Sequence, residues 1–164
     1  MSPYRCTTPE LCDRFAVTRR RCAILRGLLD YRAILTREGI VNGFQWLGGS
    51  FMEEIEKLES RPPNDLDVVS FLAVDLNVAK AAISRVPLLF DRAATKRDYH
   101  LDHFPVDAAF HPFNTVDLAR YWFGLFSHRR NAVWRGLLRV ELNCGTEDQA
   151  ARQILDVREM TVPA

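Results

Sequence analysis

Two aspartates, Asp65 and Asp67, stand one residue apart at the start of the apolar run DLDVVSFLAV. Side chains in a β-strand alternate between its two faces, so both carboxylates point to the same side. They repel each other there, and burying them is unfavourable unless a cation offsets their charge. Mg²⁺ is the natural cation, because it binds a few carboxylates together with waters and substrate phosphates. The pair therefore predicts a magnesium site for a reaction at phosphorus.

A glycine turn lies upstream of this acidic pair. Gly48 and Gly49 let the backbone approach a phosphate closely, and the helix expected after them presents free N–H groups. The Ser50 hydroxyl can donate a further hydrogen bond. One end of the segment thus suits a triphosphate, and the other end suits the metal ion that the triphosphate carries.

The order of these motifs resembles the signature of the polymerase-β-like nucleotidyltransferases. In that superfamily a Gly-Gly-Ser-like turn precedes Asp-x-Asp on the next strand, and a third carboxylate follows on a later strand. The lone acid of FPVDAAF fits the third position. The resemblance covers residues 44–110 and implies that two Mg²⁺ ions and a triphosphate are held by Asp65, Asp67, Asp107, Gly48, Gly49 and Ser50.

The chain has no room for the large substrate-binding domains of polymerases, so it looks like a minimal bacterial member. The resemblance then implies transfer of a nucleoside monophosphate, AMP from ATP by default, to a protein or RNA acceptor. Small members of the superfamily often act in toxin–antitoxin or antiphage defence modules with a partner protein encoded alongside. The alternative is a catalytically silent nucleotidyltransferase-like subunit that only binds within such a complex.

Each of these residues also has a purely structural interpretation. The acidic pair could cap turns at a strand end, and Ser50 could be a simple helix N-cap. Asp107 could be a buried acid paired with Arg92 or Arg97.

Two further groups of polar residues are interpreted as structural. His100, Asp102 and His103 lack the spacing of zinc ligands and are interpreted as polar loop residues. Cys144 has no neighbouring base and is interpreted as structural too.

The C-terminal half carries an aromatic stripe and a basic group. The stripe has helical spacing and is expected to face the core or a partner rather than to stack on a base; it comprises Tyr121, Trp122, Leu125 and Phe126. The basic group is interpreted as solvated, with contact to the phosphates of a nucleotide or RNA as the alternative; it comprises His128, Arg129, Arg130, Arg135 and Arg139. Lys57 and Lys96 are further candidates for phosphate contact.

The composition is that of an ordinary globular domain. The 164 residues are 48% hydrophobic and carry a net charge of +1, which provides no general attraction to nucleic acid or membrane. The N-terminus has no signal-peptide pattern, no run is apolar enough to span a membrane, and the four cysteines form no CxxC motif. We therefore expect a cytoplasmic protein with reduced thiols. Arginines crowd the first quarter, which favours a solvated helix face, with an RNA-binding helix as a third hypothesis.

Hydrophobic spacing and capping residues predict alternating helices and strands in one domain, residues 1–164. Helices are expected at 8–15, 18–37, 51–59, 77–99 with a break at Pro87, 114–129, and 146–160 after a Thr146 cap. Strands are expected within 40–50, 65–74, 104–110 and 133–142. This alternation predicts a mixed α/β (α+β) fold with a small sheet flanked by helices, in which N-terminal helices (1–39) and a C-terminal helix-strand-helix unit (113–164) enclose a motif-bearing core (40–112).

Overall fold

Helices and strands alternate along most of the chain, as its hydrophobic pattern predicts. The computed structural model describes residues 1–129, 131–143 and 145–163. The elements are β1 (Tyr4–Arg5), α1 (Thr8–Phe15), α2 (Arg19–Arg37), β2 (Gly43–Gly48), the 3₁₀ turn η1 (Ser50–Met52), α3 (Ile55–Glu59), β3 (Leu66–Leu72), α4 (Leu76–Arg85), the 3₁₀ turn η2 (Pro87–Phe90), α5 (Arg92–Tyr99), β4 (Leu101–Asp107), α6 (Pro112–Phe126), β5 (Leu138–Glu141) and α7 (Gly145–Thr161).

Within the described residues, the strands form one five-stranded mixed sheet in the order β1-β5-β2-β3-β4. β2 runs antiparallel to both of its neighbours, β3 and β5, whereas β3 and β4 run parallel. The expected fold class, a small mixed sheet flanked by helices, is therefore confirmed.

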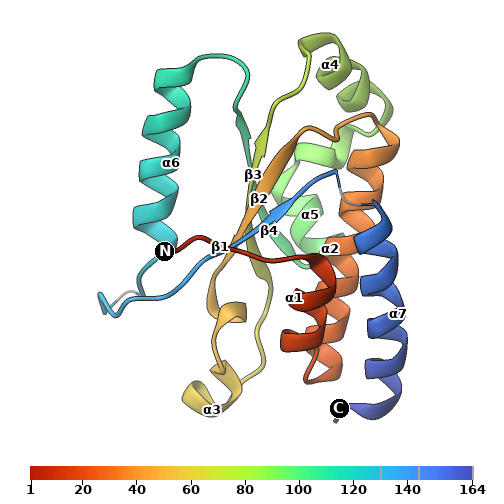
Figure 1. The fold of residues 1–164 in the computed structure, drawn as a ribbon, viewed down its shortest axis with the longest axis vertical. Helices are drawn as coiled ribbons and strands as arrows, with labels where there is room; N and C mark the ends of the chain where they lie inside the picture. Colours follow the sequence, from red (N-terminus) through yellow and green to blue (C-terminus); the bar gives the residue numbers. More distant parts are fainter. Residues whose placement is uncertain (130, 144, 164) are drawn as a thin grey trace.

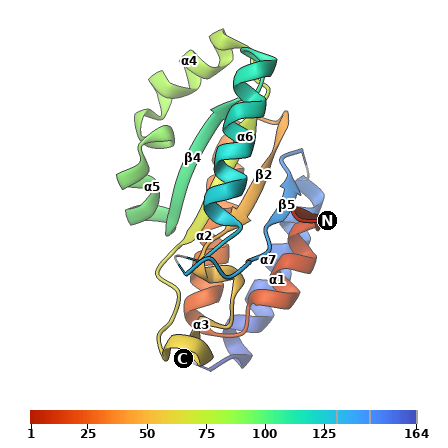
Figure 2. The ribbon, with the colours of Figure 1, turned by 90° about the vertical axis from the view of Figure 1, so that its left-hand side faces the viewer.

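The helices cover the two faces of the sheet unequally. α1, α2 and α7 lie on one face together with α5, whereas α6 lies by itself on the other (Figure 1 and, from the side of α6, Figure 2). The larger core cluster includes Leu28 of α2, Val68 of β3 and Leu155 of α7. The smaller cluster lies beneath α6 and comprises Val69, Phe71, Val106, Phe126 and Leu137.

The expected boundaries of the first helices are confirmed, and their caps explain them. Thr7 and Glu10 form a capping box at the start of α1, and the Thr18 side chain accepts a hydrogen bond from Arg21 N at the start of α2. Gly39 follows α2 with a φ of 80°. The break at Pro87 separates α4 from α5 through η2.

Several boundaries differ from the sequence-based expectation. β4 begins at Leu101 rather than at Phe104, so Asp102 and His103 lie in a strand and not in a loop. The expected helix 51–59 is divided into η1 and α3. Thr146 lies inside α7, which begins at Gly145. The interpretations of Arg130 and Cys144 concern residues outside the described ranges.

The arginine-rich helix α2 is not simply solvated, which corrects that expectation. Arg21 and Arg32 are almost completely buried. Arg32 binds Asp148 of α7 and the buried side chain of Gln45, and Arg26 binds acids of α7. These arginines attach α2 to its neighbours, which leaves fewer of them for binding RNA. Across the described residues, none of the helices is both long enough and apolar enough to traverse a bilayer.

Candidate active site

Asp67 of β3 and Asp102 of β4 occupy matching positions in two neighbouring parallel strands. The register pairs Leu66 with Leu101 and Asp67 with Asp102. Residues in register on parallel strands point to the same side of a sheet. The two carboxylates therefore lie together at the start of both strands, on the face that α6 covers further along.

The structure does not bring Asp107 to this pair. Asp107 is in register with Leu72, five residues beyond the Asp67–Asp102 pair, which corresponds to about 16 Å along the strand. An odd number of residues also directs it to the opposite face from Asp102. Its carboxylate is exposed and accepts hydrogen bonds from the backbone N–H groups of Ala109 and Phe110. Both sequence-based interpretations of Asp107, metal ligand and buried partner of an arginine, are thus corrected.

Asp65 lies just before β3 and forms an ion pair with Lys96 of α5. The Lys96 Nζ atom is 2.6 Å from Asp65 Oδ2 and 3.7 Å from Asp102 Oδ2. Arg92 lies one helical turn before Lys96 and donates hydrogen bonds from both Nε and Nη2 to the Asp102 carboxylate. The Nη2 atom is 2.7 Å from Oδ2. Two of the three acids at this edge, Asp65 and Asp102, therefore have a cationic partner.

The electrostatics single out Asp67. Burial, reinforced by the negative charges of Asp65 and Asp102, raises the pKa of Asp67 from 3.8 to about 6. In contrast, hydrogen bonds from Arg92 lower the pKa of Asp102. An additional cation beside Asp67 would relieve its electrostatic strain, because it would favour the ionised carboxylate.

The glycine turn packs directly against Asp67. Gly48 is paired with Asp67 across β2 and β3. Gly49 follows with φ 80° and ψ −173°, a conformation essentially restricted to glycine, and a Cβ atom there would overlap the Asp67 carboxylate. Only glycine therefore fits between the turn and the acid.

Ser50 begins η1 beside this carboxylate. Gly49 holds the cap position of η1 and no side-chain cap bond is present, so the N-cap interpretation of Ser50 is not supported. The Ser50 side chain lines the cavity next to Asp67. The structure thus brings Gly48, Gly49 and Ser50 together with Asp67.

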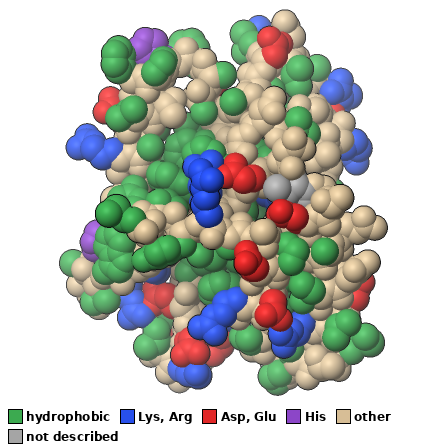
Figure 3. Space-filling view, viewed as in Figure 1, with side chains coloured by type: hydrophobic (Ala, Val, Ile, Leu, Met, Phe, Trp, Pro, Cys, Tyr) green, Lys and Arg blue, Asp and Glu red, His purple; other side chains and the backbone are tan. Residues whose placement is uncertain are grey.

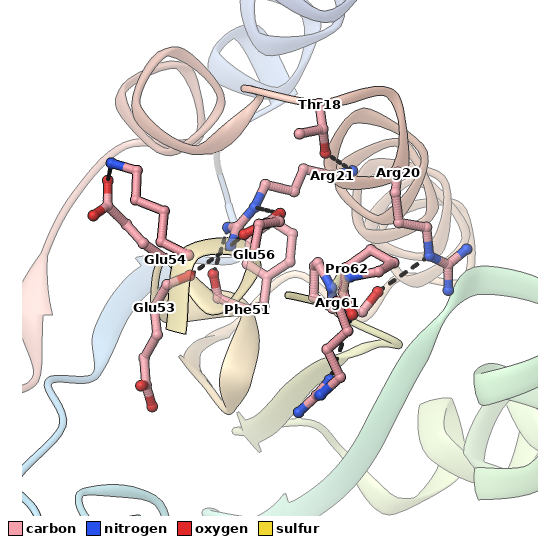
Figure 4. Close-up of polar contacts among 11 residues, drawn as sticks. Thr18, Arg20, Arg21, Phe51, Glu53, Glu54, Glu56, Arg61 and Pro62 are labelled. Carbon is pink, nitrogen blue, oxygen red and sulfur yellow. Dashed lines mark hydrogen bonds and ion pairs between the residues drawn. The ribbon is translucent and has the colours of Figure 1, made fainter. Parts of the chain in front are cut away.

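A buried arginine from α2 holds the segment after the turn in place. Arg21 donates to the backbone oxygens of Phe51 and Glu53 and forms an ion pair with Glu56 at 2.7 Å (Figure 4). Arg20 reaches the backbone oxygens of Pro63 and Asn64, which lead into β3. Helix α2 therefore fixes both ends of the connection between the glycine turn and Asp65.

A cavity of about 870 Å³ opens in front of these groups. Asp67 and Asp102 line it on the sheet side, and α6 contributes an aromatic wall with Tyr121 and Trp122. The indole Nε1 of Trp122 is buried without a hydrogen-bond partner in the structure. The cavity is large enough for a nucleotide-sized ligand.

The basic part of the cavity wall precedes β5. Arg129 and Arg135 both form ion pairs with the nearly buried carboxylate of Glu53, and all three residues line the cavity. Arg61 also lines the cavity, and so does Arg92 beside Asp102. The cavity thus combines a carboxylate side with an arginine side.

The acids at this edge suit Mg²⁺ by their chemistry, because carboxylate oxygens are its preferred protein ligands. The excess negative charge around Asp67 also fits a cation. As the described residues stand, no three acidic, histidine or cysteine side chains form a group that could hold a metal ion. Asp65 and Asp102 face Lys96 and Arg92 instead, so a metal ion would have to compete with these side chains.

Sequence reasoning missed Asp102, although a signal for it was present. β3 and β4 both begin with Leu-Asp, and the register places the two dipeptides side by side. The cationic partners of the acids, Arg92 and Lys96, carry no such signal, because their positions depend on how α5 packs against β4.

A family model matches residues 2–141, a range that contains every residue of this site. The chain belongs to DUF6932, a family of unknown function. No curated protein and no solved structure matches the chain significantly. Membership of the family assigns no activity, so the function has to be argued from the site itself.

Proposed function

We propose that this DUF6932 protein is a Mg²⁺-dependent nucleotidyltransferase. It transfers a nucleoside monophosphate, AMP from ATP by default, to a hydroxyl group of a protein or RNA acceptor and releases pyrophosphate. The proposal extends to a cytoplasmic defence or toxin–antitoxin module with a partner protein, which follows from the resemblance to small polymerase-β-like nucleotidyltransferases.

One observation carries the proposal: the in-register pair Asp67 and Asp102, with the Gly49 turn packed on Asp67. A cluster of acids on neighbouring strands beside a phosphate-binding turn is the arrangement that two-metal chemistry at phosphorus needs. Asp102 takes the role that the sequence suggested for Asp107. Asp65, Asp67 and Asp102 would hold the metal ions, whose Lewis acidity stabilises the charge that develops on the phosphate oxygens.

The rest of the cavity suits the other parts of a nucleotide. The Gly49 turn and the Ser50 hydroxyl would bind the β- and γ-phosphates. Arg129 and Arg135 can offer planar guanidinium donors to phosphate oxygens, in place of their present contacts with Glu53. The aromatic wall at Tyr121 and Trp122 would stack on the base.

A second candidate function has an observation in its favour. Lys96 and Arg92 already neutralise Asp65 and Asp102, as expected for a site that has replaced metal ions by fixed cations. In that case the protein would bind a nucleotide, or nothing at this site, without catalysis, as a silent subunit of a complex.

Label transfer from α-³²P nucleoside triphosphates distinguishes the two. The purified protein is incubated with Mg²⁺, each labelled triphosphate and host lysate as a source of acceptors. We expect label on a protein or RNA band with the wild type, and loss of it with Asp67→Asn or with EDTA. Asp98→Asn is the matched control, because Asp98 is a surface acid of α5 that pairs only with its neighbour Arg97.

Absence of transfer and of pyrophosphate release with every triphosphate would contradict the enzymatic proposal. Retained nucleotide binding in that case would support the silent subunit instead.

A further inference from the structure

Helix α6 exposes hydrophobic side chains on the side that the rest of the fold leaves uncovered. Ala119, Trp122 and Phe123 pack toward the smaller core cluster beneath the helix. On the uncovered side, Phe113 is 76% exposed and Val116 is 65% exposed. Large hydrophobic side chains that are exposed together on one helix mark an interaction site, so we expect a partner on the outer side of α6.

The space-filling view shows the same feature. Hydrophobic side chains gather over α6, on the left of Figure 3, and acidic and basic side chains interrupt them. In Figure 1 no other helix covers α6 on this side.

The outer stripe of α6 is complementary to itself. Phe113, Asp117, Arg120 and Gly124 follow one another at helical spacings of four, three and four residues, and all four are exposed. Phe113 and Gly124 are equidistant from the point between Leu118 and Ala119, and so are Asp117 and Arg120. A two-fold axis through that point would therefore bring each residue to the level of its complement on an antiparallel copy.

Both pairings are chemically sensible. A Cβ atom at Gly124 would meet nothing within 4 Å, so this position leaves an open notch that the Phe113 ring of another copy can fill. Neither Asp117 nor Arg120 forms a salt bridge with any other described residue. Opposite charges would meet twice across the axis, and the exposed side chain of Val116 would flank these contacts.

We propose that the protein forms a two-fold symmetric homodimer through antiparallel packing of the outer stripe of α6. The partner that fits this surface is a second copy of the chain, because only a copy supplies the same phenylalanine, notch and reversed pair of charges. α6 has 15 residues and is about 22 Å long, which makes the helix pair a small interface and predicts a weak dimer. This inference does not depend on the proposed nucleotidyl transfer.

Sedimentation equilibrium of charge-reversed variants tests the pairing directly. Asp117→Arg would place two arginines opposite each other, and Arg120→Asp would place two aspartates opposite each other. Each variant alone should dimerise about tenfold more weakly or worse. An equimolar mixture of the two should form heterodimers as readily as the wild type forms homodimers, because both charge pairs are then restored, one of them with reversed sign.

Two further variants separate this geometry from a general charge effect. Arg19→Asp makes the same charge change on the exposed start of α2 and should leave dimerisation unchanged. Gly124→Leu should fill the notch and weaken dimerisation. A wild type that stays monomeric at its highest attainable concentration would overturn the proposal, and so would a mixture of the two reversed variants that fails to associate.

Discussion

Asp67 of β3 and Asp102 of β4 lie side by side in register, and the cavity in front of them is also lined by Ser50. Their different environments shift the pKa values of the two carboxyls in opposite directions. Arg92 lowers the pKa of Asp102, whereas burial and neighbouring negative charge raise the pKa of Asp67 to about 6. Asp67 is therefore the acid whose ionisation should control cation binding at the site.

The raised pKa of Asp67 predicts an unusual pH dependence of stability. Between pH 4 and 6 the folded protein keeps a proton that the unfolded chain releases, so the free energy of unfolding falls as pH rises. The contribution is at most about 3 kcal/mol, from roughly 1.4 kcal/mol per pKa unit. Urea unfolding in EDTA at pH 4.5 and 6.5 should show a fall in the wild type that Asp67→Asn lacks.

Saturating Mn²⁺ should abolish that fall in the wild type, because the metal ion pairs with the ionised carboxylate. A wild type and an Asp67→Asn variant with the same pH dependence would show that Asp67 titrates normally.

Replacing Lys96 should strengthen metal binding. Lys96 competes for Asp65, and removing a unit charge about 4 Å away is worth about 1 kcal/mol in water, or roughly fivefold in affinity. Free Mn²⁺ measured by electron paramagnetic resonance should thus show tighter binding to Lys96→Gln than to the wild type. Lys57→Gln is the control, because Lys57 is exposed and, among the described residues, pairs only with Glu54. Unchanged or weaker binding by Lys96→Gln would argue that Lys96 does not occupy the cation position.

Gly49→Ala should destabilise the protein by about 2–3 kcal/mol, because its backbone conformation excludes other residues and its Cβ would overlap Asp67. Part of this loss of stability comes from the overlap of the new Cβ atom with the Asp67 carboxylate. Chemical denaturation of a double-mutant cycle should therefore show a smaller cost of Gly49→Ala in an Asp67→Ala background. An equal cost in both backgrounds would mean that the turn and the acid are not in contact.

Arg21→Met should destabilise the protein by about 3 kcal/mol. Arg21 is buried and its loss leaves Glu56 and two backbone oxygens of the glycine-turn segment without their donor. Arg19→Met, an exposed neighbour, should change the free energy of unfolding by less than about 0.5 kcal/mol. If urea unfolding shows equally small changes in the free energy of unfolding for both substitutions, α2 is a solvated basic face after all.

Local signals in the sequence were sufficient to predict where the first helices begin and which residues of β2 and β3 lie at the candidate site. Thr18 caps α2 by a contact three residues away, and the Gly-Gly-Ser turn and Asp-Leu-Asp lie at the adjoining ends of β2 and β3, which follow each other in the chain and pair with each other. The third acid could not be chosen from such signals, because the choice depends on the register between β3 and β4. His103 is buried in β4 and bonded to Ser70 of β3, yet a histidine in a polar stretch looks like a loop residue. β1 has two residues and no pattern of its own, since its partner β5 lies more than 130 residues away.

The most direct test of the account compares Asp102→Asn with Asp107→Asn, two changes of the same kind at opposite ends of β4. Binding of Mn²⁺ and ATP is measured by isothermal titration calorimetry for each variant and for the wild type. If Asp65, Asp67 and Asp102 form the metal and nucleotide site, Asp102→Asn should weaken metal binding by about tenfold or more, as loss of one charged ligand does. Asp107→Asn should bind both as the wild type does. The reverse pattern, or wild-type metal binding by Asp102→Asn, would contradict the account.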